Sequence, residues 1–238
     1  RLRREVLVWS QLDHPNILQL LGIAYGFGPP GTYGMVSPWI DNGNLSYYLD
    51  QHRIIPISNR ISMLLLRIQG ATNCKRPTLS YVIHQFIPKP LLIDIIVSNS
   101  VVHSDLTGNN VLVEKDGHML LGDFGLSSIK EDYSNGLYDT SSTPKYNLPW
   151  TAPEIVLSEA FPRPNQTTDI YSFGSVTLQV LTGVRPYQGM SEGVICRVLE
   201  KRGFPDRPKC GMVHDDFWEL MLKCWSRNSE ERPGIADI

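Results

Sequence analysis

The chain of 238 residues is 42% apolar and 19% charged, which is the composition of a folded domain with a sizeable core and excludes wholesale disorder. Its 22 Lys and Arg residues nearly balance its 24 Asp and Glu residues and give a formal net charge of −2. This balance excludes the cationic field on which general nucleic-acid and membrane-surface binders depend.

Three further properties bear on where the protein works. No apolar run approaches the roughly 18 residues that a transmembrane helix needs, so we expect no membrane segment in this chain. The four cysteines show no paired C-x-x-C spacing, which favours a reduced, intracellular and most simply cytoplasmic protein. The sequence begins at Arg1 without a leader, and we interpret it as a fragment.

The first part of the chain predicts one helix followed by two strands. Residues 2–12 carry apolar side chains at helical spacing, and this helix should end before His14-Pro15. Residues 17–23 and 33–36 are short apolar runs separated by turns rich in Gly and Pro, a pattern typical of strands.

The middle of the chain predicts two helices and a hairpin. Asn44 follows a turn and can cap a short helix through Leu49, and residues 61–68 indicate a second helix. The apolar runs 111–113 and 119–121 flank an Asp-Gly step, which is a hairpin signal.

The last third predicts helices only. Residues 170–181 share an apolar face that Gly183 can terminate, Ser191 can cap a helix over residues 195–199, and residues 217–224 give one more. Short strands early in the chain and helices late make the fold class α+β, with a mostly helical C-terminal lobe.

Three polar residues around the predicted hairpin suit phosphoryl transfer. This chemistry needs a carboxylate that orients the attacking hydroxyl, and oxygen ligands for a hard cation that neutralises phosphate charge. Asp105 and Asn110 lie on one loop before the hairpin, and the hairpin returns the chain so that Asp123 can face them. These side chains supply one acceptor for the hydroxyl proton and two metal ligands.

The same stretch resembles the eukaryotic protein kinase family, and the resemblance covers nearly the whole chain. Residues 103–110 resemble H-R-D-L-x-x-x-N, and residues 123–125 match D-F-G. Other motifs occur in family order: H-P-N-I at 14–17, A-P-E at 152–154, a likeness to D-x-W-S-F-G at 169–174, where Tyr171 replaces the Trp, and C-W-x(6)-R-P at 224–233. Each motif alone is a weak signal, but their order is specific. The group most similar is the tyrosine-kinase-like group of Ser/Thr kinases.

The resemblance implies ATP and Mg²⁺ as cofactors and a role for each site residue. Asp105 would be the catalytic base, Asn110 and Asp123 would ligate magnesium, and Glu5 would pair with a strand lysine. Leu112 would lie beneath the adenine. The hinge would hydrogen-bond the adenine through its backbone and would comprise four residues: Ser37, Pro38, Trp39 and Ile40.

Other matching residues imply structural roles. Glu154 would form an ion pair with Arg232, and Asp169 would anchor the catalytic loop. A stack of side chains would connect the two lobes, and it would comprise Trp9, Leu20, His103 and Phe124.

The sequence also departs from the family pattern. It contains no G-x-G-x-x-G loop and no V-A-I-K lysine. Ser104 replaces the Arg of H-R-D, so control by an activation-loop phosphate is in doubt. Thr107 replaces the usual lysine of Ser/Thr kinases, and Asn147 occupies the usual threonine position before Trp150. Overall likeness still favours Ser/Thr over Tyr specificity.

Residues 70–98 do not fit the family. A single helix is expected before the catalytic loop, but Pro88 and Pro90 interrupt this stretch. We interpret it as a retained intron or gene-model error, with a true insertion loop as the alternative.

We therefore expect a partial N-lobe at residues 1–37 and a hinge with the C-lobe at residues 38–238. The expected function is transfer of the ATP γ-phosphate to a protein Ser/Thr hydroxyl, although the chain as given should be inactive. The alternative is a catalytically inactive, pseudokinase-like scaffold or a truncated gene product. The partners would be ATP and a protein substrate, with no nucleic acid.

Overall fold

The computed structural model describes residues 2–26, 31–64, 101–124, 128–129, 146–160, 162–201, 203–208, 211 and 213–234. The described helices are α1 (Leu2–Trp9), α2 (Leu45–Gln51), α3 (Ile57–Leu64), α6 (Pro153–Val156), α7 (Gln166–Thr182), α8 (Glu192–Glu200), α9 (Asp215–Cys224) and the 3-10 helix η2 (Ser229–Glu231). The described strands are β1 (Gly22–Tyr25), β2 (Tyr33–Val36), β3 (Val101–Val102), β4 (Val111–Val113), β5 (Met119–Leu121) and β6 (Ser128–Ile129). The expected α+β class is confirmed.

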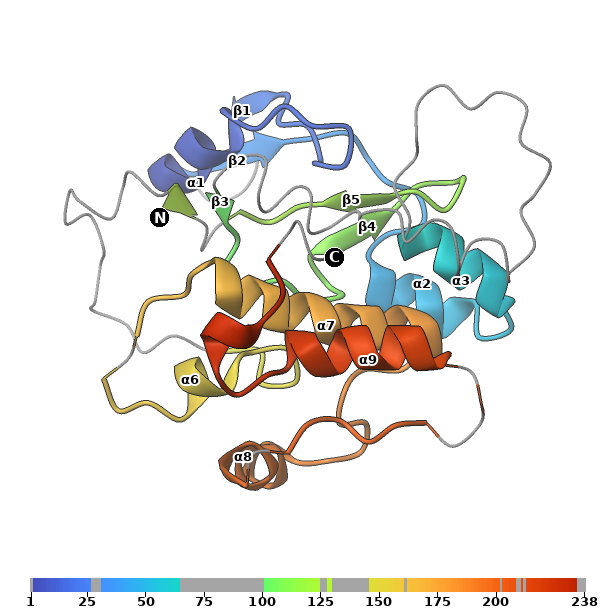
Figure 1. The fold of residues 1–238 in the computed structure, drawn as a ribbon. Helices are drawn as coiled ribbons and strands as arrows, with labels where there is room; N and C mark the ends of the chain where they lie inside the picture. Colours follow the sequence, from blue (N-terminus) through green and yellow to red (C-terminus); the bar gives the residue numbers. More distant parts are fainter. Residues whose placement is uncertain are drawn as a thin grey trace.

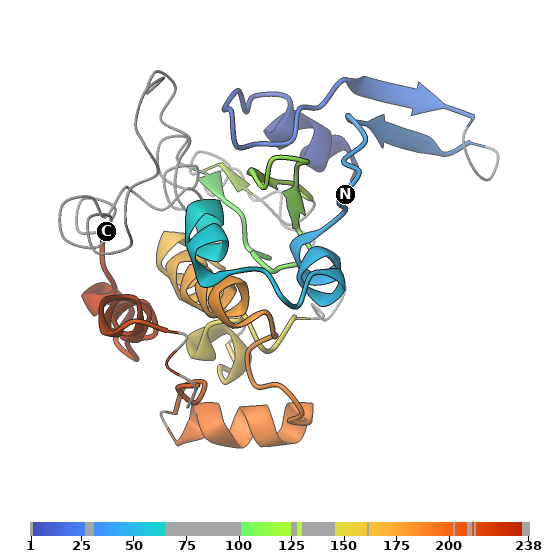
Figure 2. The same ribbon diagram turned by 90° about the vertical axis from the view of Figure 1, so that its right-hand side faces the viewer.

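The strands lie at one end of the molecule and the longer helices at the other. Figure 1 shows α1, β1 and β2 together at the top, the β4–β5 hairpin below them, and α6, α7, α8 and α9 at the bottom. Figure 2 shows β1 and β2 reaching away from the rest of the fold. The division at residues 37 and 38 stays a prediction, and residues 70–98 lie outside the described residues.

The strand expected at residues 17–23 is divided in two. Leu18 N–H donates to the Leu121 carbonyl over 2.9 Å, and Leu121 N–H donates to the Asn16 carbonyl over 2.8 Å. The chain then leaves β5, and β1 begins at Gly22, which pairs with Val36 of β2. Because the apolar run serves two different partners, it cannot form one continuous strand.

Several helix ends follow the sequence signals. The Asn44 side chain accepts from Tyr47 N–H over 2.9 Å at the start of α2. Gly183 ends α7 in the left-handed region, with φ of 77°. Ser191 precedes α8, but its side chain makes no capping hydrogen bond. Helix α3 ends at Leu64 in the described residues, so the predicted continuation to residue 68 lies outside them.

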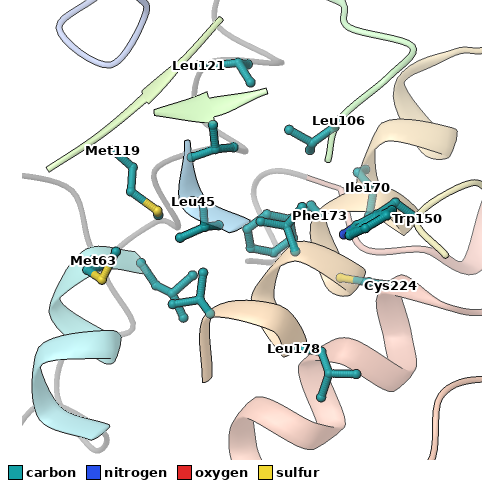
Figure 3. Close-up of a cluster of buried hydrophobic side chains, with 14 of the residues drawn as sticks. Leu45, Met63, Leu106, Met119, Leu121, Trp150, Ile170, Phe173, Leu178 and Cys224 are labelled. Atoms are coloured by element: carbon teal, nitrogen blue, oxygen red, sulfur yellow. The ribbon is translucent and has the colours of Figure 1, made fainter. Parts of the chain in front are cut away.

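Helix α7 is the centre of the core. Every residue from 168 to 181 is buried, because α3, α9 and the catalytic loop surround the helix. A helix buried on all sides needs no polar stripe, which explains the continuous apolar and small-polar sequence of α7. Figure 3 shows Trp150, Ile170 and Phe173 side by side in this core, with Leu106 between them and the hairpin.

The expected ion pair between Glu154 and Arg232 is present. Arg232 Nη1 and Nη2 donate to the two Glu154 carboxylate oxygens over 2.7 and 2.8 Å. The Arg232 side chain is 0% exposed and also donates to the Thr167 carbonyl over 2.8 Å. Such a bidentate pair fixes both position and orientation, so it attaches the chain after α9 to α6 and to the start of α7.

Within the described ranges, no helix combines the length and the apolar character needed to cross a membrane.

Candidate active site

The hairpin brings the three candidate catalytic residues to one place. Strands β4 and β5 pair antiparallel, with Val111 opposite Leu121 and Val113 opposite Met119. Gly122 N–H then donates to the Asn110 carbonyl over 2.9 Å, so residue 123 follows directly beside the catalytic loop. The hairpin predicted from the Asp-Gly step therefore has the bounds expected for it, and it positions Asp123 near Asp105 and Asn110.

Two side-chain amides hold the Asp105 carboxylate. Asn110 Nδ2 donates to Asp105 Oδ2 over 3.1 Å and to the Asp105 carbonyl over 2.8 Å. Asn147 Nδ2 donates to Asp105 Oδ1 over 2.7 Å. Each oxygen thus has one fixed donor, and a lone pair on the carboxylate stays available for an incoming hydroxyl.

The electrostatic setting of Asp105 combines burial with these donors. Burial raises the pKa of Asp105, and the Asn147 and Asn110 hydrogen bonds act in the opposite direction. The neighbouring Asp123 carboxylate also favours a raised pKa. A carboxylate with a raised pKa is a better proton acceptor than an exposed one, which suits a general base.

Asp169 on the first turn of α7 anchors the catalytic loop. Its two carboxylate oxygens accept from His103 N–H over 2.6 Å and from Ser104 N–H over 3.0 Å. Burial raises the pKa of Asp169 to about 7, although both backbone hydrogen bonds favour the ionised form. The loop is therefore attached directly to the most buried helix of the fold.

His103 connects the loop to the segment after β5. Its Nε2 donates to the Gly122 carbonyl over 3.0 Å, and its ring lies 5.3 Å from the Phe124 ring. Phe124 in turn lies 6.1 Å from the ring of Trp9 in α1. Burial lowers the pKa of His103, so the ring is a neutral packing element. The stack expected from the sequence is thus present for these three rings, and Leu20 packs half-buried against the same core.

Asp123 differs from Asp105 in both exposure and backbone geometry. It is exposed and adopts φ of 56°, which is costly for a residue with a side chain. Asn110 donates through Nδ2, which leaves its amide oxygen as the acceptor for a cation. One carboxylate and one amide oxygen form the hard, oxygen-only donor set that Mg²⁺ takes. Within the described ranges, no group of three or more His, Cys, Asp or Glu residues is placed to hold a metal ion.

The remaining predicted site residues lie on separate elements around this centre. Glu5 lies half-buried on α1. Leu112 lies half-buried in β4 and bridges Asn44, which follows the predicted hinge. In the hinge, Ser37 and Ile40 are half-buried, whereas Pro38 and Trp39 are exposed. The structure therefore brings Asp105, Asn110 and Asp123 together, while the roles predicted for Glu5, the hinge and Leu112 stay predictions.

Ser104 takes a strained conformation with an unsatisfied side chain. It adopts φ of 71°, and its Oγ is buried without a hydrogen-bond partner among the described residues. The N–H groups of Ser104 and of the preceding His103 both donate to Asp169, which holds the backbone in this conformation.

Sequence reasoning missed two contributions to the site. Asn147 was recognised only by its place before Trp150, and its direct bond to Asp105 was not expected. Gln179 of α7 was not singled out, yet it accepts from Trp150 Nε1 over 3.1 Å and donates to Ser46 Oγ over 3.0 Å. Its Oε1 lies 2.4 Å from where a Cβ at Gly108 would be, so a side chain at that position would require the Gln179 amide to shift. The sequence does offer a signal for Gln179, which is a glutamine within a largely apolar helix.

The comparisons with known proteins agree with this geometry. A model of the family described as protein tyrosine and serine/threonine kinase matches residues 1–238. The chain is 31% identical over 245 residues to ephrin type-A receptor 8 of Homo sapiens, covering 100% of this chain and 21% of that protein. It is 29% identical over 236 residues to ephrin type-A receptor 3 of Danio rerio, covering 98% and 21% respectively.

A third relative is the tyrosine-protein kinase transforming protein Abl of Abelson murine leukemia virus. The identity is 26% over 238 residues, covering 99% of this chain and 28% of that protein. The chain thus spans 21% to 28% of the length of these curated relatives. The family match extends over all 238 residues, and the chain belongs to the protein tyrosine and serine/threonine kinase family.

Proposed function

We propose that this domain transfers the γ-phosphate of ATP to a hydroxyl group of a protein substrate, with Asp105 as the base. The observation that carries the proposal is the carboxylate held between the Asn110 and Asn147 amides beside Asp123. A scaffold needs none of these groups in this arrangement.

In the proposed reaction, the acceptor hydroxyl oxygen forms a bond to the γ-phosphorus, and the bond between that phosphorus and ADP breaks. The hydroxyl proton passes to Asp105, whose carboxylate is oriented by its two amide donors. Fixed donors reduce the reorganisation that the step requires, which is how positioned groups lower a barrier in phosphoryl transfer.

Asn110 and Asp123 would hold magnesium, and the segment Ser37–Ile40 with Leu112 would contact the adenine of ATP. Bound magnesium would neutralise phosphate charge as it develops. The chain's own contribution is to present two oxygen ligands next to the base and to leave water sites for the rest of the coordination shell.

We further propose tyrosine as the favoured acceptor. The sequence alone favoured Ser/Thr, but that preference finds no support among the relatives, one of which is named a tyrosine-protein kinase. Thr107 gives no lysine at the position where Ser/Thr kinases were expected to carry one. The use of ATP and the free thiols of Cys196 and Cys224 support an intracellular setting.

The test is the variant Asp105→Asn in a protein in which a glycine loop and a strand lysine precede this chain, because the 238 residues alone are expected to be inactive. It is assayed with radiolabelled ATP and copolymers that contain either tyrosine or serine. We expect kcat to fall by about 10²–10⁴, because the amide cannot accept the proton, while ATP affinity is largely unchanged. Asp123→Ala should instead weaken nucleotide binding only when magnesium is present. Normal turnover by Asp105→Asn would remove Asp105 from the mechanism.

A non-catalytic scaffold is the second candidate, and Ser104 in place of the family's arginine and Thr107 in place of its lysine favour it. It predicts that the protein transfers no phosphate to either copolymer even when a glycine loop and a strand lysine precede the folded chain. Tyrosine transfer that depends on Asp105 would exclude the scaffold, and transfer to serine alone would correct the acceptor.

A further inference from the structure

The segment between β2 and α2 lies along strand β4 and the turn that follows it (Figure 1). Residues 41–44 run antiparallel to residues 112–115, and each residue of one stretch contacts its counterpart in the other. The four pairs are Asp41 with Lys115, Asn42 with Glu114, Gly43 with Val113, and Asn44 with Leu112. We call this the hinge–hairpin contact, because it joins the end of the predicted hinge to the hairpin that carries Leu112.

A closed turn at the end of the hinge brings the chain to the hairpin. Gly43 N–H donates to the Ile40 carbonyl over 3.0 Å, and Gly43 adopts φ of 67°, a left-handed conformation that favours glycine. Val113 N–H donates in turn to the Gly43 carbonyl over 3.0 Å, so the backbone of the turn is bonded directly to β4. Asp41 and Asn42 are the two central residues of this turn, and they reach the hairpin through their side chains.

Asn42 bonds the hinge turn to the turn of the hairpin. Its Nδ2 donates to the Glu114 carbonyl over 2.8 Å, and the residue is half-buried. The Glu114 carbonyl also accepts from Gly117 N–H over 3.0 Å, a bond within the hairpin turn. Both acceptor positions of this carbonyl are therefore used. Asn42 thus binds the hairpin at a point that the hairpin's own backbone already fixes.

The outermost pair of the hinge–hairpin contact is an exposed ion pair. Lys115 Nζ lies 2.7 Å from Asp41 Oδ2, but the two side chains are 81% and 49% exposed. Water and salt screen such a pair, and exposed ion pairs contribute little to stability. Of the two side chains in the hinge turn, Asn42 is therefore the one that we expect to hold it against the hairpin.

The hinge–hairpin contact joins the two surfaces that adenine would use. The backbone of Ser37–Ile40 would hydrogen-bond the edge of the ring, and Leu112 would lie against its face. These surfaces come from distant parts of the sequence, so a contact in the folded chain must set their relative position. A ligand gains the full binding energy of both surfaces only when their separation already matches the ring, because a loose site has to be ordered at the moment of binding.

We propose, resting on the proposed function, that Asn42 is a positioning residue for ATP, which holds the hinge at the separation from Leu112 that an adenine ring needs. It acts through the Glu114 carbonyl and not on the nucleotide itself. The consequence is selectivity for the base. Adenine uses the hinge and Leu112 at once, whereas a base whose edge does not fit the hinge gains nothing from their alignment.

The experiment measures the Kd of ADP and of GDP in the presence of Mg²⁺, by competition with a fluorescent ATP analogue. The protein is the one in which a glycine loop and a strand lysine precede this chain. Asn42→Ala should weaken ADP binding about five-fold, the usual size for one hydrogen bond between neutral groups, and should leave GDP binding unchanged. The KM for ATP should rise by the same factor, whereas kcat at saturating ATP should not change.

Three further variants assign the effect to the hydrogen bond. Asn42→Asp keeps the shape of the side chain but cannot donate to the Glu114 carbonyl, so it should weaken ADP binding at least as much as Asn42→Ala. Lys115→Ala breaks the exposed ion pair and should change the Kd of ADP by less than about two-fold. Asn59→Ala removes the same amide from an exposed position on α3 and should change neither Kd. Circular dichroism of each variant establishes that it is folded.

Equal weakening of ADP and GDP binding would show that Asn42 acts only on general stability and would overturn the inference. ADP binding by Asn42→Asp that equals that of the parent, or a parent that does not prefer ADP to GDP, would overturn it as well. Phosphate transfer by the same proteins separates the inference from the proposed function. Selective ADP binding that depends on Asn42, without transfer, would contradict only the proposed function, and transfer with an ADP preference that ignores Asn42 would contradict only the inference.

Discussion

The two ends of the molecule carry their apolar side chains in opposite ways. In α7, residues 168–181 are all buried, and Phe173 is 1% exposed. In the β1–β2 sheet, by contrast, Ile23 is 53% exposed and Tyr25 is 64% exposed, and among the described residues the Tyr25 ring pairs with the ring of Tyr33, at 5.1 Å. The energy that holds the fold together is therefore concentrated in the helical end.

The catalytic loop is attached to that stable end. Asp169 on the first turn of α7 binds the backbone of His103 and Ser104, and Gln179 near its last turn packs against Gly108. One helix thus holds the loop at both of its ends. Activity should therefore depend on the integrity of α7, whereas the geometry of Asp105 should tolerate changes in the exposed sheet.

The largest loss of stability is expected from a change in the core around α7. Phe173→Ala removes an aromatic side chain from a fully buried site and should lower the free energy of unfolding by about 3–5 kcal/mol. Urea denaturation followed by circular dichroism measures it. A loss below about 1 kcal/mol would mean that the core collapses around the gap and that α7 is not the centre of stability.

The sequence predicts helix α7 and the β4–β5 hairpin well. Apolar spacing with a terminating Gly183 indicates α7, and the Asp-Gly step gives both strands of the hairpin with the observed bounds. Local signals succeed here because each of these elements ends where its own sequence pattern ends. They fail at residues 17–23, where a single apolar run pairs first with β5 and then with β2, and tertiary pairing decides where the strand begins.

The sequence predicts which residues carry the chemistry of the site, but it predicts fewer of the contacts that hold them. The family motifs identify Asp105, Asn110 and Asp123, because phosphoryl transfer restricts those positions to oxygen ligands and a base. They do not identify the bond from Asn147, which is 42 residues away in the sequence from Asp105. Such a contact depends on how residues 146–150 pack against the catalytic loop, and no local pattern encodes it.

A second, smaller loss of stability is expected when Asp169, the anchor of the catalytic loop, is changed. Asp169→Asn keeps one acceptor but leaves one backbone N–H of the loop without a partner, and should cost about 1–3 kcal/mol near pH 5. The pKa of Asp169 is raised to about 7 in the folded state, from 3.8. Its contribution to stability is therefore complete below about pH 4 and is lost as the pH rises through 7. The cost of the variant should shrink between pH 5 and pH 8, as measured by urea denaturation at both. A cost that grew over this range would contradict a raised pKa.

The contact between Asn147 and Asp105 should affect catalysis more than stability. Asn147→Ala removes a hydrogen bond that favours the ionised carboxylate, so the pKa of Asp105 should rise. We expect kcat to fall about ten-fold, which corresponds to about 1.4 kcal/mol, and the acidic limb of the pH–rate profile to move to higher pH. Asn59→Ala, which removes the same amide from an exposed position on α3, is the control. An unchanged pH profile would show that Asn147 acts only through packing.

The smallest change in the free energy of unfolding is expected in the β1–β2 sheet, at the end of the molecule opposite the helices. Ile23→Ala changes a side chain that is more than half exposed, so the free energy of unfolding should change by less than about 0.5 kcal/mol. Met35 lies opposite Ile23 in the sheet but packs against the core, and Met35→Ala should cost clearly more. Both values come from urea denaturation at several protein concentrations. Suppose that Ile23→Ala lowers the free energy of unfolding by more than about 1 kcal/mol. If that loss grows with protein concentration, a second copy or another segment covers this face. If it does not, the assignment of stability to the helical end is contradicted.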